Sequence, residues 1–497
     1  MLTIREILAA TCGTLLRGSE DLAVFSVSTD TRNLEPGALY VSLVGERFDG
    51  HGFAADAVAR GAVAVLVSRD AQVPENAAVV RVADTLQAFG HLARHWRRKL
   101  GIKIVAVTGS SGKTSTKEAI ADLLGRFVPT AKSFANYNNE IGVPLTLLSL
   151  REGPEAAVLE LAMRGSGEIR YLAEVAEPDI GVITNIGMAH IGRLGSREAI
   201  AAAKGELVAQ MEDGIAILNG DDPYCRELGA RHRHAIYFST QGPENAHVWA
   251  ASDLAQVDGA WQFRANWRIP GPESASASAS VPASASETCL GPASGRDDRW
   301  GSPAGSAPAG SAPAASGTAT VTLSIPGTHH VANALAAIAV AASLGYSLPA
   351  EFTLSPQPVG GRSRLIAVGD VEVLDESYNA NPESVRATLD SFCKLPCPGR
   401  RVAVLGDMAE LGDFSADEHR AIGRDLDALP IDVVVTVGEF ADLIAEATTR
   451  ETIRCRSNGE AVSELGRLLR PGDRLLVKGS RAGRLEEIIA GLSEVYA

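Results

Sequence analysis

The stretch KIVAVTGSSGKTSTKEA, from Lys103 to Ala119, constrains the fold of this chain more than any other. Its apolar, β-branched start predicts a buried strand, the glycine and serine residues from Thr108 to Gly112 predict a turn, and Lys113 begins a predicted helix. Glycines in such a turn let backbone N–H groups approach an anion, and the helix N-terminus adds the positive end of its dipole. This layout predicts a cradle for the phosphates of a nucleotide.

Two residues that follow the turn have specific predicted roles. Lys113 supplies a positive charge for the terminal phosphates, and Thr114 offers a hydroxyl to a magnesium ion. The strict form of the motif would place its first glycine at Val107, whereas this chain has that glycine at Gly109. The alternative is a strand-to-helix turn that contains GKT by chance. We favour the cradle because strand, turn and helix all agree with the motif.

Composition and charge narrow the class of protein. The chain has 497 residues, which predicts two to four domains, and its 45% hydrophobic and 21% charged residues are typical of soluble globular proteins. The formal net charge of -14 argues against nucleic acid or a membrane surface as the main partner. A site for an anionic substrate would therefore have to be locally basic.

The first residues and the cysteines indicate the compartment. The segment MLTIREILAATCGT carries charges of both signs and lacks a long apolar core, which is not typical of a signal peptide. No apolar run approaches the ~20 residues that span a bilayer. The six cysteines are scattered, without the spacing of a disulfide framework or a zinc site. We expect a cytoplasmic protein with free thiols.

Residues 1–100 predict a small α/β domain, because short apolar runs around Val41, Val65 and Val80 alternate with helical stretches. Two polar loops stand out, STDTR at 28–32 and GERFDGHGF at 45–53. Such loops beside strands are suited to a polar ligand, but ordinary turns have the same composition, and composition alone favours ordinary turns. The basic stretch at 91–99 is interpreted as a solvated helix face.

Residues 101–352 predict a mostly parallel, doubly wound sheet, because strand and helix patterns alternate regularly. Ligands of such sheets gather at the carboxyl ends of the strands, where Glu160 and His190 are expected. A carboxylate and an imidazole near Thr114 would suit magnesium. Lys204 lies on an alanine-rich predicted helix, and without other information such a lysine is expected at the surface.

Residues 272–316 consist mainly of alanine, serine, proline and glycine, which cannot bury enough apolar surface to offset the entropy of ordering. We predict a disordered insertion without a catalytic role. Residues 353–497 repeat the strand and helix alternation and predict a Rossmann-like domain, although the dinucleotide fingerprint is missing. The polar segments of this domain are GGRSR, DESYNANPES, LGDMAELG and KGSR, for which plain turns are the alternative.

Taken together, the chain resembles the Mur ligase family. The motifs that carry the resemblance occur in the order TGSSGKTSTKE, NYNNEIGVPLTLL, ELAMRG, TNIGMAH, AKGEL, GTHHVANALAA, DESYNANPES, VLGDMAELG and KGSR. The resemblance implies three domains, which bind a UDP-sugar, bind ATP, and close over both. The SYNANP segment resembles the branch that joins D-alanyl-D-alanine to UDP-N-acetylmuramoyl-tripeptide in peptidoglycan precursor synthesis.

The resemblance implies ATP and Mg²⁺ as cofactors, and a role for individual residues. ATP would contact Gly109, Ser110, Ser111, Gly112, Lys113, Thr114, Ser115, His329, Asn333, Arg362 and Asp375. Magnesium would be held by Thr114, Glu160, His190 and Lys204, and many members of the family carbamylate the position of Lys204. The two peptide substrates would contact Ser28, Thr31, Arg32, Asp49, Gly50, His51, Asn138, Asn139, Tyr378, Asn379 and Asn381. The implied catalytic residues are Lys113, Lys204 and His190.

The implied reaction is the activation of a substrate carboxylate as an acyl phosphate, which the amine of the dipeptide then converts into an amide. We expect a monomer that acts on these small molecules, without nucleic acid or membrane insertion. Some positions depart from the family pattern: no acidic residue follows His190 closely, His330 stands where asparagine is common, and Glu376 replaces a usual aspartate. The alternatives are another amide ligase of the superfamily, such as the branch that adds the third amino acid or a folylpolyglutamate synthetase, and a nucleotide-binding ATPase or regulator.

Overall fold

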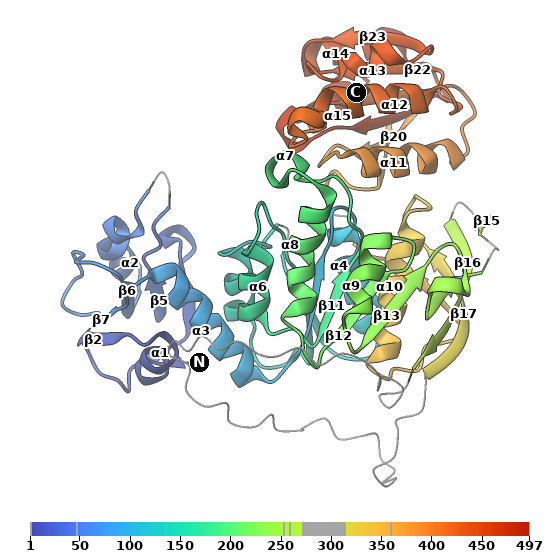
Figure 1. Cartoon of the computed structure of the whole chain (residues 1–497). Helices are drawn as coiled ribbons and strands as arrows, with labels where there is room; N and C mark the ends of the chain where they lie inside the picture. The colour runs from blue at the N-terminus through green and yellow to red at the C-terminus, as the bar shows by residue number, and fades with distance from the viewer. Residues whose placement is uncertain are drawn as a thin grey trace. The chain divides into compact units, whose positions relative to one another are not determined.

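The computed structural model describes residues 2–45, 48–134, 136–251, 254–257, 260–270, 315–357 and 360–496 (Figure 1). Most of these residues form two compact units, one with Met1–Gly101 and Pro144–Arg151 and the other with Ile102–Val143, Glu152–Arg268 and Ser316–Ala497. The insertion predicted at 272–316 lies outside the described residues except for Ala315 and Ser316, which already belong to strand β17. The domain limits at 100 and 352 stay predictions.

The first unit has the α/β structure that its alternating pattern predicts. Its five-stranded sheet has the order β2-β7-β6-β5-β4, and all neighbours except β2 and β7 are parallel. The strands are β2 (Thr14–Arg17), β4 (Ser26–Ser28), β5 (Ala38–Val41), β6 (Ala64–Val67) and β7 (Ala78–Arg81). A pair, β1 (Leu2–Thr3) with β3 (Ala23–Val24), and helices α1 (Ile4–Thr11), α2 (Ala54–Ala59) and α3 (Thr85–Leu100) accompany the sheet. Every residue of β5 and β6 is buried, as expected for parallel strands with two covered faces.

Helix α3 contains the basic stretch at 91–99, in which His91, Arg98 and Lys99 are exposed as the interpretation of a solvated face expects, and it has a buried side as well. Phe89, Leu92 and Trp96 are buried at a spacing of three and four residues, which places them on one side of the helix. The indole Nε1 of Trp96 donates a hydrogen bond to the Leu150 carbonyl at 3.0 Å. The basic residues of this stretch therefore belong to an amphipathic helix with a buried apolar face.

The second unit contains an eleven-stranded sheet whose larger part is parallel and doubly wound. Seven strands are parallel neighbours in the order β9-β10-β8-β11-β12-β13-β14. These strands are β8 (Lys103–Thr108), β9 (Thr130–Lys132), β10 (Ala156–Glu160), β11 (Ile180–Ile183), β12 (Ile215–Asn219), β13 (Ala235–Ser239) and β14 (Val248–Ala250). The apolar run at 104–107 thus forms a buried strand near the centre of the sheet, as predicted.

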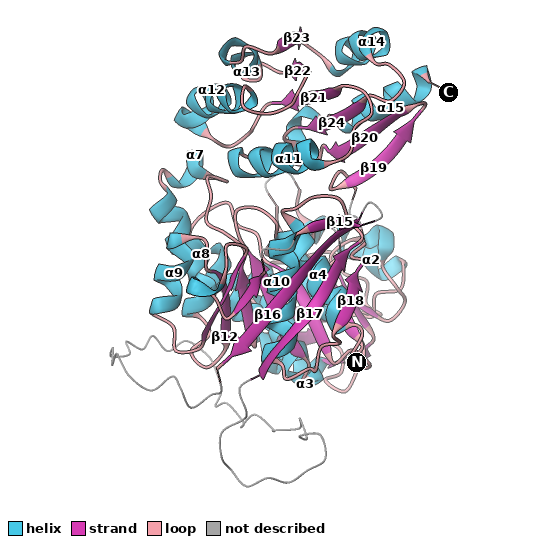
Figure 2. Ribbon diagram, turned by 90° about the vertical axis from the view of Figure 1, so that its right-hand side faces the viewer, coloured by secondary structure: helices cyan, strands magenta, loops and turns pink. Residues whose placement is uncertain are grey.

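Helices cover both faces of this parallel sheet (Figure 2). Helices α4 (Lys113–Leu124) and α10 (His330–Ser343) pack against each other on one face, and α6 (Glu168–Ala176), α8 (Arg197–Ala209) and α9 (Pro223–Ala230) lie on the other. Helix α10 is almost entirely buried, which agrees with its alanine-rich sequence. Helix α7 (Ile191–Leu194) also belongs to the second unit, whereas most of helix α5 (Gly142–Ser149) belongs to the first.

The same sheet continues in strands that the doubly wound pattern does not predict. Strand β14 pairs with β16 in antiparallel fashion, and β17 and β18 extend the sheet beyond β16. The strands are β15 (Ala255–Val257), β16 (Ala260–Ile269), β17 (Ala315–Leu323) and β18 (Glu351–Leu354). Strand β16 is the longest of these four strands. Its buried and exposed residues alternate, because one face of the strand packs on the core.

The C-terminal part has its own six-stranded sheet, in the order β19-β20-β24-β21-β22-β23. All neighbours except β19 and β20 are parallel, which confirms the Rossmann-like prediction. The strands are β19 (Arg364–Val368), β20 (Val371–Glu376), β21 (Arg401–Gly406), β22 (Val433–Val437), β23 (Glu451–Cys455) and β24 (Arg474–Lys478). The helices are α11 (Pro382–Lys394), α12 (Ser415–Leu426), α13 (Asp442–Ala447), α14 (Asn458–Leu468) and α15 (Glu486–Val495). Among the described residues, no helix combines the length and the apolar character that crossing a membrane requires.

Buried His419 makes the stability of this part depend on pH. Its Nε2 accepts the Met408 N–H at 2.9 Å, so the neutral ring carries its proton on Nδ1, 2.6 Å from the Ser415 carbonyl. Burial lowers the pKa of His419 below its ordinary value of 6.5. Below pH 6.5 the unfolded chain therefore takes up a proton that the folded chain does not, and stability falls.

We expect the wild-type protein to lose free energy of unfolding between pH 7 and pH 5, with His419 contributing about 1 kcal/mol. His419→Gln is expected to reduce this slope, since glutamine does not titrate. Urea denaturation at the two pH values measures both proteins. An equal slope in the variant would contradict the role of His419.

Candidate active site

The turn after β8 has the backbone conformation that only glycine adopts easily. Gly109 has φ of 148° and Gly112 has φ of 78°, both in the region that side chains disfavour. A Cβ atom on Gly109 would lie 1.9 Å from Thr184 Oγ1, so the turn also lacks room for a side chain. Helix α4 begins directly afterwards at Lys113. The strand, turn and helix of the predicted phosphate cradle are therefore present.

The segment after β11 holds the cradle in place. Asn185 accepts the Ser111 N–H through its side chain and the Ser110 N–H through its backbone carbonyl, each at 3.0 Å. Thr184 Oγ1 donates to the Ser111 carbonyl at 2.5 Å. The sequence interpretation used the TNIGMAH segment for His190 alone and missed these two supporting residues. Their place at the end of a strand parallel to β8 was the signal that pointed to them.

Glu160 lies beside the cradle at the carboxyl end of β10. Its Oε2 accepts the Thr114 hydroxyl at 2.5 Å, and its Oε1 accepts the Asn138 amide at 2.8 Å. The structure thus brings together Thr114 and Glu160 as predicted, with Asn138 on the same carboxylate. A carboxylate and a hydroxyl beside a phosphate site fit Mg²⁺, which takes oxygen ligands. No cluster of three His, Cys, Asp or Glu side chains suited to a metal occurs in the part of the chain that the structure describes.

Two lysines face this region from different helices. Lys113 Nζ donates to the Gly109 carbonyl at 2.8 Å, and burial lowers the pKa of this lysine, while the charge of Glu160 opposes the shift. Lys204 in α8 is only 1% exposed, which shows that the surface position expected from the alanine-rich sequence was wrong. Burial first, and the charge of Lys113 second, hold the pKa of Lys204 well below its usual range.

His190 is paired with a residue of the C-terminal part. Its Nδ1 lies 2.5 Å from Glu410 Oε2, as an ion pair without the geometry of a well-directed hydrogen bond. The imidazole holds the pKa of Glu410 below its usual value. The Gly192 N–H also donates to the Glu410 carbonyl at 3.0 Å. The structure therefore places His190 against Glu410 and outside the residues that line the main cavity.

A cavity of about 690 Å³ lies within the second unit, between the parallel sheet and the C-terminal part. The predicted residues on its wall are Ser110, Ser111, Gly112, Lys113, Thr114, Ser115, Glu160, His329, Asn333, Arg362, Asn379 and Asn381. Apolar side chains, among them Phe238, Leu254 and Phe263, line another part of the wall and suit a nucleotide base. The cavity therefore combines a phosphate cradle, an apolar region and polar groups of the C-terminal part.

Several predicted residues lie off this wall, namely Gly109, Asn138, Asn139, His190, Lys204, Asp375 and Tyr378. Asp375 Oδ1 accepts the N–H and the hydroxyl of Ser377, and the neighbouring Glu376 faces the cavity instead. The ring of Tyr378 lies 4.1 Å from the guanidinium of Arg362, a cation–π distance. Asn139 caps the start of helix α5 by accepting the Gly142 N–H at 2.9 Å.

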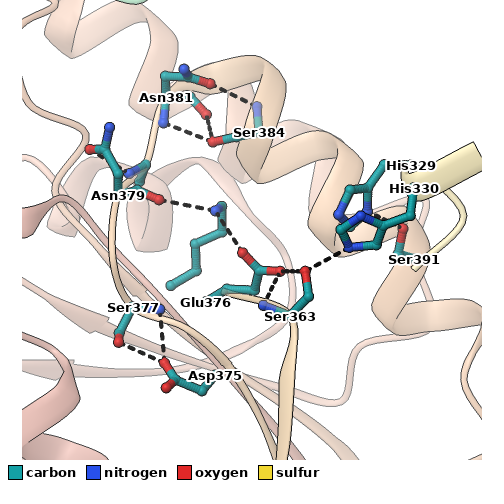
Figure 3. A network of polar contacts seen from close by, with 12 residues as sticks. His329, His330, Ser363, Asp375, Glu376, Ser377, Asn379, Asn381, Ser384 and Ser391 are labelled. Carbon is teal, nitrogen blue, oxygen red and sulfur yellow. Dashed lines mark hydrogen bonds and ion pairs between the residues drawn. The ribbon is translucent and has the colours of Figure 1, made fainter. Parts of the chain in front are cut away.

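Hydrogen bonds connect helix α4 through α10 to the C-terminal part, and Figure 3 shows the section from His330 onward. Thr116 Oγ1 donates to Asn333 Oδ1 at 2.8 Å, which turns the Asn333 amide nitrogen toward His330 Nδ1 at 3.0 Å. His330 Nδ1 is therefore an acceptor, and the neutral ring carries its proton on Nε2, 2.8 Å from Ser363 Oγ. Burial keeps the pKa of His330 well below its usual value, which favours this neutral form.

The chain of hydrogen bonds ends on a lysine at the carboxyl end of β24. Ser363 Oγ donates to Glu376 Oε1 at 2.7 Å, and Glu376 Oε2 lies 3.8 Å from Lys478 Nζ (Figure 3). Lys478 also donates to the Asn379 carbonyl at 3.1 Å and lines the cavity. The sequence interpretation noted KGSR and DESYNANPES without assigning Lys478 or Glu376. The rule that ligands gather at carboxyl strand ends was the signal for both.

Replacing Ser363 with alanine tests this connection. Ser363→Ala leaves His330 Nε2 without its acceptor and Glu376 Oε1 without its hydroxyl donor, so we expect a loss of about 1–3 kcal/mol in the free energy of unfolding. Urea denaturation measures the change. Ser463→Ala, on the exposed side of helix α14, is the control and should change stability little. Equal effects of the two substitutions would show that the buried connection contributes nothing specific.

The predicted loops of the first unit lie beside its parallel sheet. Asp49 Oδ1 lies 2.7 Å from His51 Nδ1, and His51 Nε2 accepts the Ser68 N–H at 3.0 Å, which fixes the neutral tautomer with its proton on Nδ1. The Tyr40 hydroxyl donates to the Gly50 carbonyl at 3.0 Å. Burial raises the pKa of Tyr40 to about 12.

The STDTR loop of the same unit forms a compact turn. Ser28 Oγ donates to the Asp30 carbonyl at 2.9 Å, and Arg32 forms an ion pair with Asp30 at 2.6 Å. Thr31 lies beside Asp56, whose pKa is lowered first by Arg60 and then by this hydroxyl. The described residues of the two polar loops both belong to the first unit.

Comparison with known proteins agrees with this architecture. Three family models match the chain: "Mur ligase family, catalytic domain" at residues 24–97, "Mur ligase middle domain" at 107–271 and "Mur ligase, glutamate ligase domain" at 361–481. A UDP-N-acetylmuramoyl-tripeptide--D-alanyl-D-alanine ligase of Synechocystis is 36% identical, over 95% of this chain and 93% of the relative. The ligase of the same name from Bacillus subtilis is 34% identical, over 99% of this chain and 98% of the relative.

Solved structures show the same similarity. The crystal structure of MurF from Acinetobacter baumannii matches with a TM-score of 0.80 and 32% identity, over 99% of this chain and 98% of that one. MurF ligase from Thermotoga maritima, solved in complex with ADP, matches with a TM-score of 0.78 and 26% identity, over 96% and 99%. From the matches along nearly its whole length, this chain belongs to the Mur ligase family.

Proposed function

We propose that the protein is an ATP-dependent ligase that joins D-alanyl-D-alanine to UDP-N-acetylmuramoyl-tripeptide in peptidoglycan precursor synthesis. The observation that carries the proposal is the single cavity whose wall combines the phosphate cradle with Asn379 and Asn381 of the SYNANP segment. The names and the full-length similarity of the relatives support it.

The residues of the cradle bind the terminal phosphates of ATP in this proposal. The backbone N–H groups that follow Ser111, at the end of the turn and the start of helix α4, stabilise the charge that develops as a carboxylate of the tripeptide attacks the γ-phosphorus, together with the ammonium of Lys113. ADP leaves, and the tripeptide holds an acyl phosphate. Magnesium ions would supply further charge neutralisation when bound. We propose Thr114 as a ligand of one ion and Glu160 and His190 as ligands of a second, with a carbamylated Lys204 helping to hold the metal.

Other predicted residues have proposed roles in binding and orientation. His329, Asn333, Arg362 and Asp375 contact the adenosine and phosphate groups. Ser28, Thr31, Arg32, Asp49, Gly50 and His51 bind the UDP-sugar end of the tripeptide, and Asn138, Asn139, Tyr378, Asn379 and Asn381 bind peptide groups. Holding both reactants together raises the chance that the acyl phosphate meets the amine before water.

The proposal includes three domains with limits at residues 100 and 352, a cytoplasmic location and a monomeric state. The net charge of -14 agrees with a protein that remains soluble. Light scattering after gel filtration measures the mass in solution, and a value near twice 52.0 kDa would contradict the monomer.

One assay separates this function from its alternatives. The purified protein receives ATP, magnesium and UDP-N-acetylmuramoyl-tripeptide, together with D-alanyl-D-alanine, diaminopimelate, glutamate or no amine. We expect phosphate release that depends on both the tripeptide and D-alanyl-D-alanine. Release with another amine would indicate a different ligase of the superfamily, and release without any amine would indicate an ATPase.

A further inference from the structure

Glu383 has a carboxylate oxygen that the rest of the described chain does not satisfy. Its Oε1 accepts the Met188 N–H at 2.8 Å, whereas its Oε2 is shielded from solvent and has no hydrogen-bond partner among the described residues. A buried polar atom without a hydrogen-bond partner lowers the stability of the fold by about 1–3 kcal/mol, so such atoms are rare and often have a functional role. Glu383 lines the cavity, where a ligand can provide the missing donor.

The other carboxylates on the cavity wall already have partners. Glu160 accepts hydrogen bonds on both oxygens, Glu376 pairs with Lys478 and Ser363, and Asp390 pairs with Lys394 at 2.6 Å. Asp222 accepts the Ile186 N–H and caps helix α9. Among the described acidic residues on this wall, Glu383 therefore has the carboxylate oxygen that is buried without a hydrogen-bond partner, and this oxygen can take a cationic group of a ligand.

The backbone around Glu383 is fixed. Asn381 caps helix α11 and forms a capping box with Ser384, so Glu383 is held in the first turn of the helix (Figure 3). A Cβ atom on Gly187 would lie 2.6 Å from the Glu383 carboxyl carbon, which shows how closely the side chain packs against the segment after β11.

This position is next to the phosphate cradle. Gly187, which the Glu383 carboxylate touches, donates its N–H to Ser110 Oγ at 2.8 Å, and the Asn381 amide donates to the Ser110 carbonyl at 3.4 Å. Ser110 belongs to the turn that is proposed to hold the terminal phosphates. The Glu383 carboxylate therefore lies next to the turn that would hold the reacting phosphate.

We propose that Glu383 binds the ammonium group of the incoming dipeptide and accepts a proton from it. This inference rests on the proposed function. Glu383 Oε2 takes one N–H proton, and the nitrogen lone pair that is freed attacks the carbonyl carbon of the acyl phosphate. A C–N bond forms, the C–O bond to phosphate breaks, and inorganic phosphate leaves with the electron pair of that bond. The remaining extra proton on nitrogen passes to the departing phosphate, so that atoms and charges balance.

The test uses the full-length protein and its isosteric variant Glu383→Gln, which keeps an acceptor for the Met188 N–H. With D-alanyl-D-alanine, kcat for phosphate release should fall by about 100-fold or more, because loss of a side chain that transfers a proton in the transition state usually has an effect of this size. Acyl phosphate trapped by borohydride reduction in the absence of an amine should be unchanged. Hydroxylamine, which is largely unprotonated at neutral pH, should still capture the acyl phosphate as a hydroxamate at the wild-type rate.

The controls separate this role from a structural one. Glu487→Gln, in an exposed ion pair with Arg484 on helix α15, should leave every rate unchanged. Glu383→Asp keeps the charge and should retain more dipeptide-dependent activity than Glu383→Gln. The inference is overturned if Glu383→Gln turns over the dipeptide like the wild-type protein, or if it loses trapped acyl phosphate and hydroxamate to the same extent as amide. Wild-type protein without dipeptide-dependent phosphate release would instead refute the proposed function itself.

Discussion

Lys113→Ala is expected to reduce ATP-dependent phosphate release by about 1,000-fold or more without unfolding the protein, because removing a charged contact to a transferring phosphoryl group has effects of this size. Lys113 Nζ has one hydrogen bond to the protein, to the Gly109 carbonyl. Burial lowers its pKa, which shows that the ammonium is held at an energetic cost in the absence of phosphate. Its removal should therefore leave the melting temperature unchanged or slightly higher.

The matched control is Lys103→Ala at the other end of the same strand. Lys103 pairs with Asp179 at 3.1 Å, away from the cradle, so its removal should affect stability slightly and turnover very little. Phosphate release and thermal unfolding measured on both variants separate chemistry from folding. Retention of more than about a tenth of the activity in Lys113→Ala would remove this lysine from the proposed mechanism.

The cradle was predictable from the sequence because its chemistry is local. Strand, turn and helix follow one another within residues 103–119, and each has its own residue pattern. The positive φ of Gly109 and Gly112 is a property of the turn that the glycines themselves indicate. The approach of Glu160 to Thr114 followed from the rule that carboxyl strand ends meet at one edge.

Other parts of the site depend on contacts between distant segments, which no local pattern encodes. Asn185 supports the cradle only because β11 is the neighbour of β8 in the sheet. Glu383 is separated from Met188 by 195 residues, and its unpartnered oxygen is visible only when the two segments meet. The pairing of His190 with Glu410 likewise depends on the placement of the C-terminal part.

The burial of Lys204 could not be predicted from the sequence for a different reason. An alanine-rich helix such as REAIAAAKGELVA has weak contrast between its faces, so its sequence does not reveal which side is buried. The neighbouring Glu206 is also buried, because its carboxylate accepts the Gly167 N–H at 2.8 Å and the Arg170 N–H at 3.0 Å at the start of helix α6. Glu206 is buried where α8 packs against α6, whereas Lys204, two residues earlier and so on a different side of the helix, is buried near Lys113.

Lys204→Met is expected to abolish turnover and to make the protein more stable. Lys204 is buried, and burial first and the charge of Lys113 second hold its pKa well below the usual range. A buried ammonium group without a counter-charge destabilises a fold. An apolar side chain of similar length removes that cost, so we expect an increase of about 1–3 kcal/mol in the free energy of unfolding. Phosphate release should fall by about 100-fold or more if the proposed carbamate contributes to the metal site.

The lowered pKa also favours the neutral amine, which is the form that adds to carbon dioxide. Carbamylation would convert this neutral amine into an anion beside Lys113, so the positive charge of Lys113, which disfavours a lysine cation here, would favour the modified form. Carbon-13 NMR with labelled bicarbonate should show a carbamate signal in the wild-type protein that is absent from Lys204→Met, whereas Lys103→Met should keep both the signal and the activity. A Lys204→Met protein that is less stable than the wild type would contradict a destabilising effect of the buried lysine. A variant that retains most of its turnover would contradict a role of Lys204 in the active site.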